Sequence, residues 1–427
     1  MMNIAAHPRY ENYQDTGVEW LGNVPSAWAI TRLGTVFTER RTKVSDKDYE
    51  PLSVTKNGIL QQLDSAAKTN DGDNRKLVKK GDFVINSRSD RKGSSGVSPL
   101  DGPVSLINIV LQPKGIHPDF CNYVLKSYAF VEEFYRMGHG IVADLWTTRY
   151  DEMRGILMAL PSPDEQRAIA AFLDEKCAKI DGAMKIKEDQ IALLRERRQI
   201  IIQDAVTRGL NPAAPMKDSG IDWIGQIPAH WDVMRLKHIS KIRYGLGQPP
   251  KESDDGLPLL RATNVERGKI NPANLIRVDP ADVPTGRDAF LKAGEIIVVR
   301  SGAYTGDSAI VPSGYDGSVA GYDMVVTASG VDCHFLALAL LTPYVLFEQL
   351  YLLRMRAAQP HLNKEELSET VILVPPPQEQ HLIAERMSIE SNKIEDGIAI
   401  KERQIAALKE YKTSLINAAV TGKIKVI

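Results

Sequence analysis

Cysteine is scarce in this chain, whose 427 residues include three cysteines and no CxxC pair. This scarcity excludes a disulfide framework and is typical of a protein kept in a reducing compartment. Long apolar runs are also few, because the most apolar stretch, residues 335–353, is interrupted by Pro343 and Glu348. We therefore expect no membrane span. The first residues, MMNIAAHPRYENYQ, include no apolar signal-peptide core, so we expect a cytoplasmic protein.

Neither sign of charge is in excess, since 53 basic and 54 acidic residues leave a formal net charge of −1. Any surface for nucleic acid must therefore be local. Catalytic signatures are missing too: the sequence has no GxxxxGK[ST], HExxH or GxSxG motif, and no Asn-Pro-Pro-aromatic motif of an amino-methyltransferase. The eight histidines form no pair with metal-ligand spacing. We predict no metal site, no cofactor bound by this chain and no catalytic residue.

What the chain does have is an internal repeat. DTGVEWLGNVPSAW at residues 15–28 returns as DSGIDWIGQIPAHW at residues 218–231, with an Asp, two Gly, two Trp and a Pro in register. Such near-identity within one chain favours contact with a shared partner, although a purely structural role explains it as well. We take as candidate partner-binding residues Trp20, Pro25, Trp28, Trp223, Pro228 and Trp231.

A second repeat is longer. Residues 161–207 align without gaps on residues 375–421, from a proline-rich start to a closing AVT. The chain therefore has the order A–B–A′–B′. We predict four segments, at residues 1–160, 161–209, 210–373 and 374–427.

Each B segment has the pattern of a long helix. Prolines occur only at its start, and apolar residues return at spacings of three and four. About 45 helical residues give a rod of about 65 Å. A helix packed on its own domain is one explanation, but two seams of equal length and phase favour an intramolecular coiled coil. Its predicted seam residues are Ile180, Met184, Ile191, Leu194, Ile201, Ile394, Ile398, Ile405, Leu408 and Leu415.

Each A segment alternates short β-branched runs with turn residues and ends in an apolar helical stretch. The predicted fold class is therefore α+β, with two globules of similar fold, two long helices and a pseudo-two-fold internal repeat. The alignment between the globules is weak: residues 77–86 match residues 290–299, and little else is shared. Like segments should bind like partners, so the divergent loops should face different ligands or different parts of one ligand.

These features resemble a known family. The W-x-G-x-x-P-x-x-W segments, the PPPQEQ helix start and the AAVTGKI ending are similar to those of the specificity subunit of type I restriction-modification systems. The resemblance covers nearly the whole chain, in the family's order of recognition domain, helix, recognition domain and helix. It departs mildly in the first copy, which has PSPDEQ in place of PPPQEQ.

The resemblance implies a non-catalytic subunit that binds a bipartite, asymmetric sequence in double-stranded DNA. Each target-recognition domain would contact one half-site, and an antiparallel helix pair would set the spacer between the half-sites. Two modification subunits that use S-adenosylmethionine for adenine methylation would dock on this chain. Restriction subunits that use ATP and Mg²⁺ would join that complex, which would act in defence against phage.

Local sequence suggests which residues contact DNA. Loops such as NRKLVKKG, SRSDRKG and RATNVERGKIN mix cations for phosphates or guanine with amides for adenine. Each loop taken alone is equally well explained as a solvated surface, and the tyrosines as core or rim residues. The candidates are Lys56, Asn57, Arg88, Arg91, Lys92, Arg149, Tyr244, Asn264, Arg267, Lys269, Arg300, Tyr304, Arg356, Gln359, His361 and Asn363.

Two other functional classes are alternatives to this hypothesis. A stand-alone nuclease or methyltransferase would show activity from the isolated chain, and the sequence offers no site for it. A coiled-coil scaffold would bind protein partners without sequence-selective affinity for DNA, and it is the principal alternative.

Overall fold

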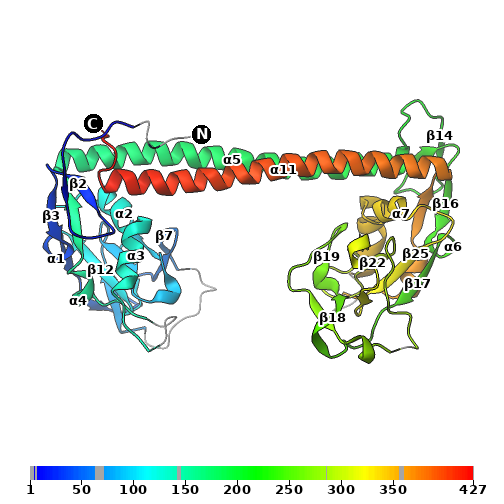
Figure 1. The fold of residues 1–427 in the computed structure, drawn as a ribbon, viewed down its shortest axis with the longest axis horizontal. Helices are drawn as coiled ribbons and strands as arrows, with labels where there is room; N and C mark the ends of the chain where they lie inside the picture. Colours follow the sequence, from blue (N-terminus) through cyan, green and yellow to red (C-terminus); the bar gives the residue numbers. More distant parts are fainter. Residues whose placement is uncertain are drawn as a thin grey trace. The chain divides into compact units, whose positions relative to one another are not determined.

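The computed structural model describes residues 4, 7–62, 72–141, 146–284, 286–354 and 360–426, apart from the Arg354 side chain. The chain forms two compact units: Met1–Glu188 with Glu402–Ile427, and Asp189–Lys401. We call them the first and the second unit and describe each by itself. Each unit contains one globule and one part of each long helix (Figure 1).

The two longest elements are α5 (Pro163–Arg208) and α11 (Pro377–Val420). Both begin at a proline, where the missing N–H costs no intrahelical hydrogen bond, and both carry acidic residues in the first turn, where the helix dipole favours them. Each helix begins in one unit and ends in the other.

The long helices pack on each other in antiparallel fashion within each unit. In the first unit, Lys412 Nζ of α11 lies 2.7 Å from both carboxylate oxygens of Asp181 on α5. In the second unit, Arg198 of α5 forms an ion pair with Glu395 of α11. Asp181 and Glu395 occupy matching positions of the sequence repeat, as do Arg198 and Lys412. The two ion pairs are therefore equivalent under the internal symmetry.

The apolar seam runs along the contact between α5 and α11. Seven of its predicted residues are buried: Ile180, Ile191, Ile394, Ile398, Ile405, Leu408 and Leu415. Met184, Leu194 and Ile201 are half-buried. The packing is close enough that a Cβ on Gly397 would lie 3.7 Å from Leu194 Cδ1.

In the first unit, a four-stranded antiparallel sheet with strand order β10-β9-β12-β4 forms the main layer, beside a three-stranded sheet with order β11-β8-β5. Helix α2 covers β9 and β10. The strands are β1 (Tyr13–Asp15), β2 (Asn23–Pro25), β3 (Ala29–Arg32), β4 (Phe37–Glu39), β5 (Lys43–Val44), β6 (Leu52–Thr55), β7 (Gly58–Gln61), β8 (Arg75–Val78), β9 (Phe83–Asn86), β10 (Ser95–Val97), β11 (Gly102–Val104), β12 (Asn108–Pro113) and β13 (Leu157–Leu160). The short helices are α1 (Leu33–Val36), η2 (Ser89–Arg91), α2 (Pro118–Lys126), α3 (Tyr128–Arg136) and α4 (Tyr150–Met153).

The second unit repeats this plan with the sheet β17-β25-β22-β23 and with α7 packed on β23 and β25. Its strands are β14 (Met216–Asp218), β15 (Gln226–Pro228), β16 (Asp232–Arg235), β17 (Ser240–Tyr244), β18 (Glu252–Leu260), β19 (Val265–Glu266), β20 (Lys269–Ile270), β21 (Ile276–Val278), β22 (Ile296–Val298), β23 (Ser308–Ile310), β24 (Val319–Ala320), β25 (Met324–Ala328) and β26 (Val371–Val374). Its short helices are α6 (Leu236–Ile239), η4 (Ala262–Asn264), η5 (Pro280–Asp282), η6 (Ser313–Tyr315), α7 (Cys333–Leu340), α8 (Pro343–Val345), η7 (Leu346–Leu350), α9 (Tyr351–Arg354) and α10 (Lys364–Ser368).

A buried ion pair marks the same place in both main sheets. In the first unit, Arg40 forms a bidentate contact with Asp82, at 2.6 Å and 3.0 Å. In the second unit, Arg243 does the same with Glu295, at 2.6 Å and 2.7 Å. Burial raises the pKa of Glu295, but the hydrogen bonds from Arg243 and Thr327 outweigh it and lower that pKa below its usual value. The two globules thus share a scaffold, and the predicted α+β class with two long helices is confirmed.

Among the described residues, no single helix is long and apolar enough to cross a membrane. One bent pair, Cys333–Leu340 with Pro343–Leu353, meets the criterion of length and composition only when the two pieces are taken together, with a bend of 63°.

The C-terminal end of α11 closes the core of the first unit. Gly422 follows the helix with φ of 69°, a left-handed conformation that glycine adopts without strain. A Cβ at this position would lie 2.2 Å from Pro25 Cδ and 3.3 Å from the ring of Trp28. Beyond it, Lys423 Nζ donates to the carbonyl oxygen of Leu21 at 3.0 Å. The first copy of the Trp motif is thus held by the end of the second helix.

We predict that Gly422→Ala lowers the free energy of unfolding by about 1–3 kcal/mol, because a left-handed backbone is strained for alanine and its Cβ clashes with Pro25. Gly182→Ala is the matched control: Gly182 lies within α5 with nothing within 4 Å of its Cβ position. That substitution should stabilise the helix by up to about 1 kcal/mol. The midpoint of thermal unfolding measures both, and equal midpoints for the two variants would contradict this account.

Candidate nucleic-acid interface

A basic pocket of about 490 Å³ lies at the rim of the first globule. Two of the predicted DNA-binding residues, Arg88 and Arg149, line it. The other three cations of its lining are Arg41, Lys43 and Lys76. Lys76 belongs to the candidate stretch NRKLVKKG, which forms strand β8 and is not a loop. Arg41 and Lys43 lie on or beside strands β4 and β5 and were not predicted, because no loop composition marks them out.

Several of the cations in the first globule have acidic partners. Arg88 Nε lies 3.1 Å from Asp90, and Arg91 Nε lies 3.8 Å from the same carboxylate. Lys92 Nζ forms a 2.6 Å ion pair with Glu132. Because exposed pairs of this kind contribute little to stability, these side chains can exchange their partner for a phosphate at small cost.

In the second globule, three side chains contact the guanidinium of Arg300. Arg300 Cζ lies 4.5 Å from the ring centre of Tyr244 and 4.2 Å from that of Tyr322. Arg300 Nη2 lies 3.1 Å from His361 Nε2. We call these four residues the arginine clamp. The clamp unites three predicted residues that are distant in sequence, and Tyr322 is the member that was left out of the prediction.

The clamp rests on a buried carboxyl. Asp323 Oδ1 accepts a hydrogen bond from the backbone N–H of Arg300 at 3.2 Å. Burial raises the pKa of Asp323 to about 6, against the opposing effect of that hydrogen bond and of the positive charge of Arg300. The hydrogen bond to Asp323 therefore fixes the backbone at Arg300.

The loop that follows β18 differs from its sequence prediction. Asn264 is fully buried, and its amide donates to the carbonyl oxygens of Asn271 and Ala273. This side chain holds the loop together and is not exposed for base contact. Arg267 contacts Asp307 at 3.4 Å and the hydroxyl of Tyr351 at 3.1 Å.

Lys269 lies 2.8 Å from Glu395 on α11, which also pairs with Arg198. The hydrogen bond from Lys269 is the main reason why the pKa of Glu395 lies below its usual value. The hairpin of β19 and β20 is thus attached to the helix pair within the second unit. The charge of Lys269 is used in this attachment.

The remaining candidates are dispersed. Lys56 and Asn57 form the exposed turn between β6 and β7. Tyr304 is 56% exposed. Asn363 caps α10, because its Oδ1 accepts a hydrogen bond from the N–H of Glu366 at 2.8 Å. Arg356 and Gln359 lie outside the described residues.

The repeated Trp motif is for the most part core. Trp28 and Trp231 are 2% and 0% exposed, and Pro25 and Pro228 are buried as well. The prediction that these four residues face a partner is corrected here: they fill the space under the ends of the long helices. Trp20 is half-buried against Phe130, with their ring centres 5.8 Å apart.

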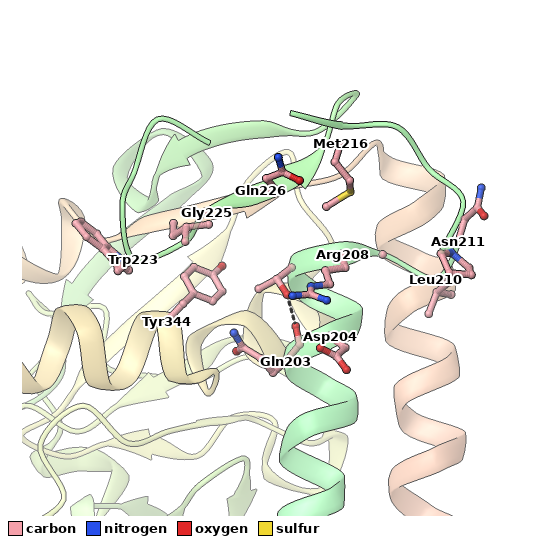
Figure 2. A pocket seen from close by; sticks show the side chains of 14 residues that line it. Gln203, Asp204, Arg208, Leu210, Asn211, Met216, Trp223, Gly225, Gln226 and Tyr344 are labelled. Atoms are coloured by element: carbon pink, nitrogen blue, oxygen red, sulfur yellow. Dashed lines mark hydrogen bonds between the residues drawn. The ribbon is translucent and has the colours of Figure 1, made fainter. Parts of the chain in front are cut away.

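Trp223 is the exposed member of the set, with 49% of its surface accessible. It lines a pocket of about 830 Å³ between the end of α5 and the second copy of the motif. Figure 2 shows this pocket, with Gln203 and Arg208 from α5 on one side and Trp223 and Tyr344 on another.

The residues that follow the two long helices differ in exposure. Leu210 corresponds to Ile424 when the helix repeat is continued without a gap. Ile424 is 2% exposed, whereas Leu210 is 42% exposed. The left-handed glycine, Gly422, comes directly after AVT in α11, whereas its counterpart, Gly209, comes one residue later in α5. The backbone therefore leaves the two helices in different ways.

Among the described residues, no group of three or more His, Cys, Asp or Glu side chains could hold a metal ion.

The chain is similar to a known family and to several known proteins. The family described as type I restriction modification DNA specificity domain matches residues 228–410. A protein of Methanocaldococcus jannaschii, named as the MjaX type I restriction enzyme specificity subunit, is 22% identical over 446 aligned positions that cover 97% of each chain. The MjaVIII type I restriction enzyme specificity subunit of the same organism is 26% identical over 278 positions, covering 64% of this chain and 63% of that one.

A solved structure from work on complex assembly and conformational transition of the type I R-M system has a similar fold. Its TM-score is 0.69 at 16% identity, and the match covers 93% of this chain and 98% of that chain. At this identity the likeness concerns the fold alone.

We predict that Lys269→Ala reduces the salt dependence of DNA binding less than Lys56→Ala does, because Lys269 must give up its 2.8 Å ion pair with Glu395 before it can contact a phosphate. Lys56→Ala, at an exposed turn, should reduce the slope of log K against log salt by about 0.9, the value for one lost phosphate contact. Binding of duplex DNA by the assembled complex at several salt concentrations measures both slopes. An equal loss of slope in the two variants would show that Lys269 leaves Glu395 to bind phosphate.

Proposed function

Because this chain belongs to the family of type I restriction-modification specificity subunits, we propose that it binds a bipartite, asymmetric sequence in double-stranded DNA. Each globule contacts one half-site through the loops at its rim. The chain itself carries out no chemistry, and it directs the catalytic subunits of the complex to their target.

One observation carries this proposal: the two globules share a scaffold but differ at the rim. The main sheets have the same strand order and the same buried arginine–carboxylate pair. At the rim, the first globule has a pocket lined by five cations, whereas the second has the arginine clamp. Similar folds with unlike contact surfaces suit the recognition of two different half-sites.

The repeated parts of the chain support a second element of the proposal. Two modification subunits, which carry S-adenosylmethionine and methylate adenine, bind the two copies of the repeated long-helix region. A repeated sequence favours two copies of one partner. Restriction subunits that use ATP and Mg²⁺ then join the complex.

The long helices set the distance between the half-sites. The continuity of the helices supports this role, since each helix runs without a break from one unit into the other. Helix length is fixed by hydrogen bonding along the backbone, so a paired helix is a stiff element of defined length.

The principal alternative is a coiled-coil scaffold that binds proteins without sequence-selective affinity for DNA. The basic pocket and the arginine clamp favour DNA binding over this alternative, because a scaffold has no need of unlike cationic rims on two similar globules.

We predict that replacing residues 30–155 by the matching segment of a homologous subunit changes one half of the methylated sequence and leaves the other half intact. The replaced segment holds the whole rim of the first globule. Mapping of methylated adenines in cells that express the hybrid with its modification subunit gives the result directly.

The reciprocal exchange of residues 233–369 is the control, and it should change only the other half-site. Hybrids in which both half-sites change, or in which neither does, would contradict the assignment of one half-site to each globule. A complex that methylates without sequence preference would favour the scaffold alternative.

A further inference from the structure

The arginine clamp holds a guanidinium that is fixed in orientation but not neutralised. Rings on both sides of Arg300, at 4.5 Å and 4.2 Å, restrict rotation of the planar group and attract its charge. Within the described residues Arg300 forms no ion pair.

His361 fixes the edge of the guanidinium that is left for a ligand. Arginine can only donate hydrogen bonds, so His361 Nε2 accepts from Arg300 Nη2 and carries its own proton on Nδ1. Arg300 Nε is buried without a partner in the described part of the chain. Nη1 has no hydrogen-bond partner among the described residues either. Because Nε is buried, a ligand can reach only the N–H of Nη1 and the second N–H of Nη2, and these two donors lie in a fixed plane.

The clamp belongs to only one of the two globules. In the aligned strands, Arg300 corresponds to Ser87 and His361 corresponds to Thr147. The bridges between the two loops are nevertheless equivalent, since Ser301 pairs with His361 and Arg88 pairs with Thr147. The scaffold is thus conserved between the globules while the side chain that it presents is exchanged. This difference is what recognition of unlike half-sites requires.

We propose that Arg300 recognises a guanine in the half-site bound by the second globule, and that Tyr244, Tyr322 and His361 are positioning residues that orient its guanidinium. Guanine offers the acceptors O6 and N7 in the major groove, which match two parallel N–H donors of arginine. A phosphate would need the charge but not the fixed plane. This inference rests on the proposed function of the chain.

The clamp has a second consequence for affinity. Long side chains lose rotamer freedom when they bind, and a guanidinium that is already stacked between two rings has lost part of that freedom beforehand. Tyr244 is itself fixed, because its hydroxyl accepts a hydrogen bond from the N–H of Lys364 at 2.8 Å. Tyr322 is 46% exposed and covers the guanidinium from the side nearer to solvent.

The test is selection of DNA by the full chain in complex with its modification subunits, from a duplex library randomised over the recognised region. Arg300→Lys keeps the charge and removes the two-pronged donor. We expect this variant to lose preference for guanine at one position by roughly 5- to 150-fold, with all other positions unchanged. The slope of affinity against salt should stay the same.

Two variants of Tyr322 test the positioning role. Tyr322→Phe keeps the ring and should retain the preference for guanine, whereas Tyr322→Leu removes the ring and should weaken it at the same position as Arg300→Lys. Equal thermal midpoints of the two variants show that the protein is folded. If Tyr322→Leu selects the same sequences as the wild type, the positioning role is refuted.

The outcomes separate this inference from the proposed function. A wild-type complex that selects no bipartite sequence contradicts the proposed function itself, and the inference falls with it. A wild-type complex that selects one, together with Arg300→Lys variants that bind all sequences more weakly by the same factor, identifies Arg300 as a phosphate contact. In that case, or if Arg300→Lys changes no position, only the inference about guanine is refuted.

Discussion

The apolar seam between α5 and α11 is the contact that the rest of the molecule needs. Neither globule has a complete core without it, since the core of the first unit includes Leu408 and Leu415 of α11 and that of the second includes Val206 of α5. The seam is set in register by two equivalent ion pairs, Asp181 with Lys412 and Arg198 with Glu395. A shift of one helix along the other would separate both pairs and leave charges against apolar side chains. Register, core closure and helix pairing therefore depend on one another.

This arrangement divides the chain into parts that must remain alike and parts that are free to differ. The helices, the Trp motif and the main sheets are constrained by packing: the helices and the Trp motif match in sequence, and the main sheets match in strand order. The rims carry no such constraint, because loops at a surface contribute little to the core. The basic pocket of the first globule and the arginine clamp of the second are products of that freedom. A single chain can thus present two unlike surfaces for DNA on one repeated framework.

Much of this fold follows from sequence patterns, because heptad spacing and an ungapped repeat report directly on helices that pack together. The loops around Arg300 were also predicted, since cations, Ser and Gly gather there. Burial of Trp28 and Trp231 was one of two open alternatives, because a Trp that recurs in both copies of the motif suits a core as well as a partner surface. Lys269 was assigned to DNA because its partner Glu395 lies 126 positions away in the chain and leaves no local sign. Arg41 and Lys43 were missed for a different reason: residues on or beside strands line a cationic pocket only when the sheets are assembled.

The most direct test of the central claim is to lengthen both helices and to measure the spacer of the methylated sequence. Seven residues inserted after Lys187 and seven after Lys401 keep the seam in phase and add about 10 Å to each helix. At about 3.4 Å per base pair this corresponds to roughly three base pairs, with some loss of affinity from rotation along the duplex. Insertion of four residues breaks the phase of the seam and should impair the complex more severely. The account predicts a longer spacer between unchanged half-sites in the heptad variant. A heptad variant with full activity and an unchanged spacer would contradict it.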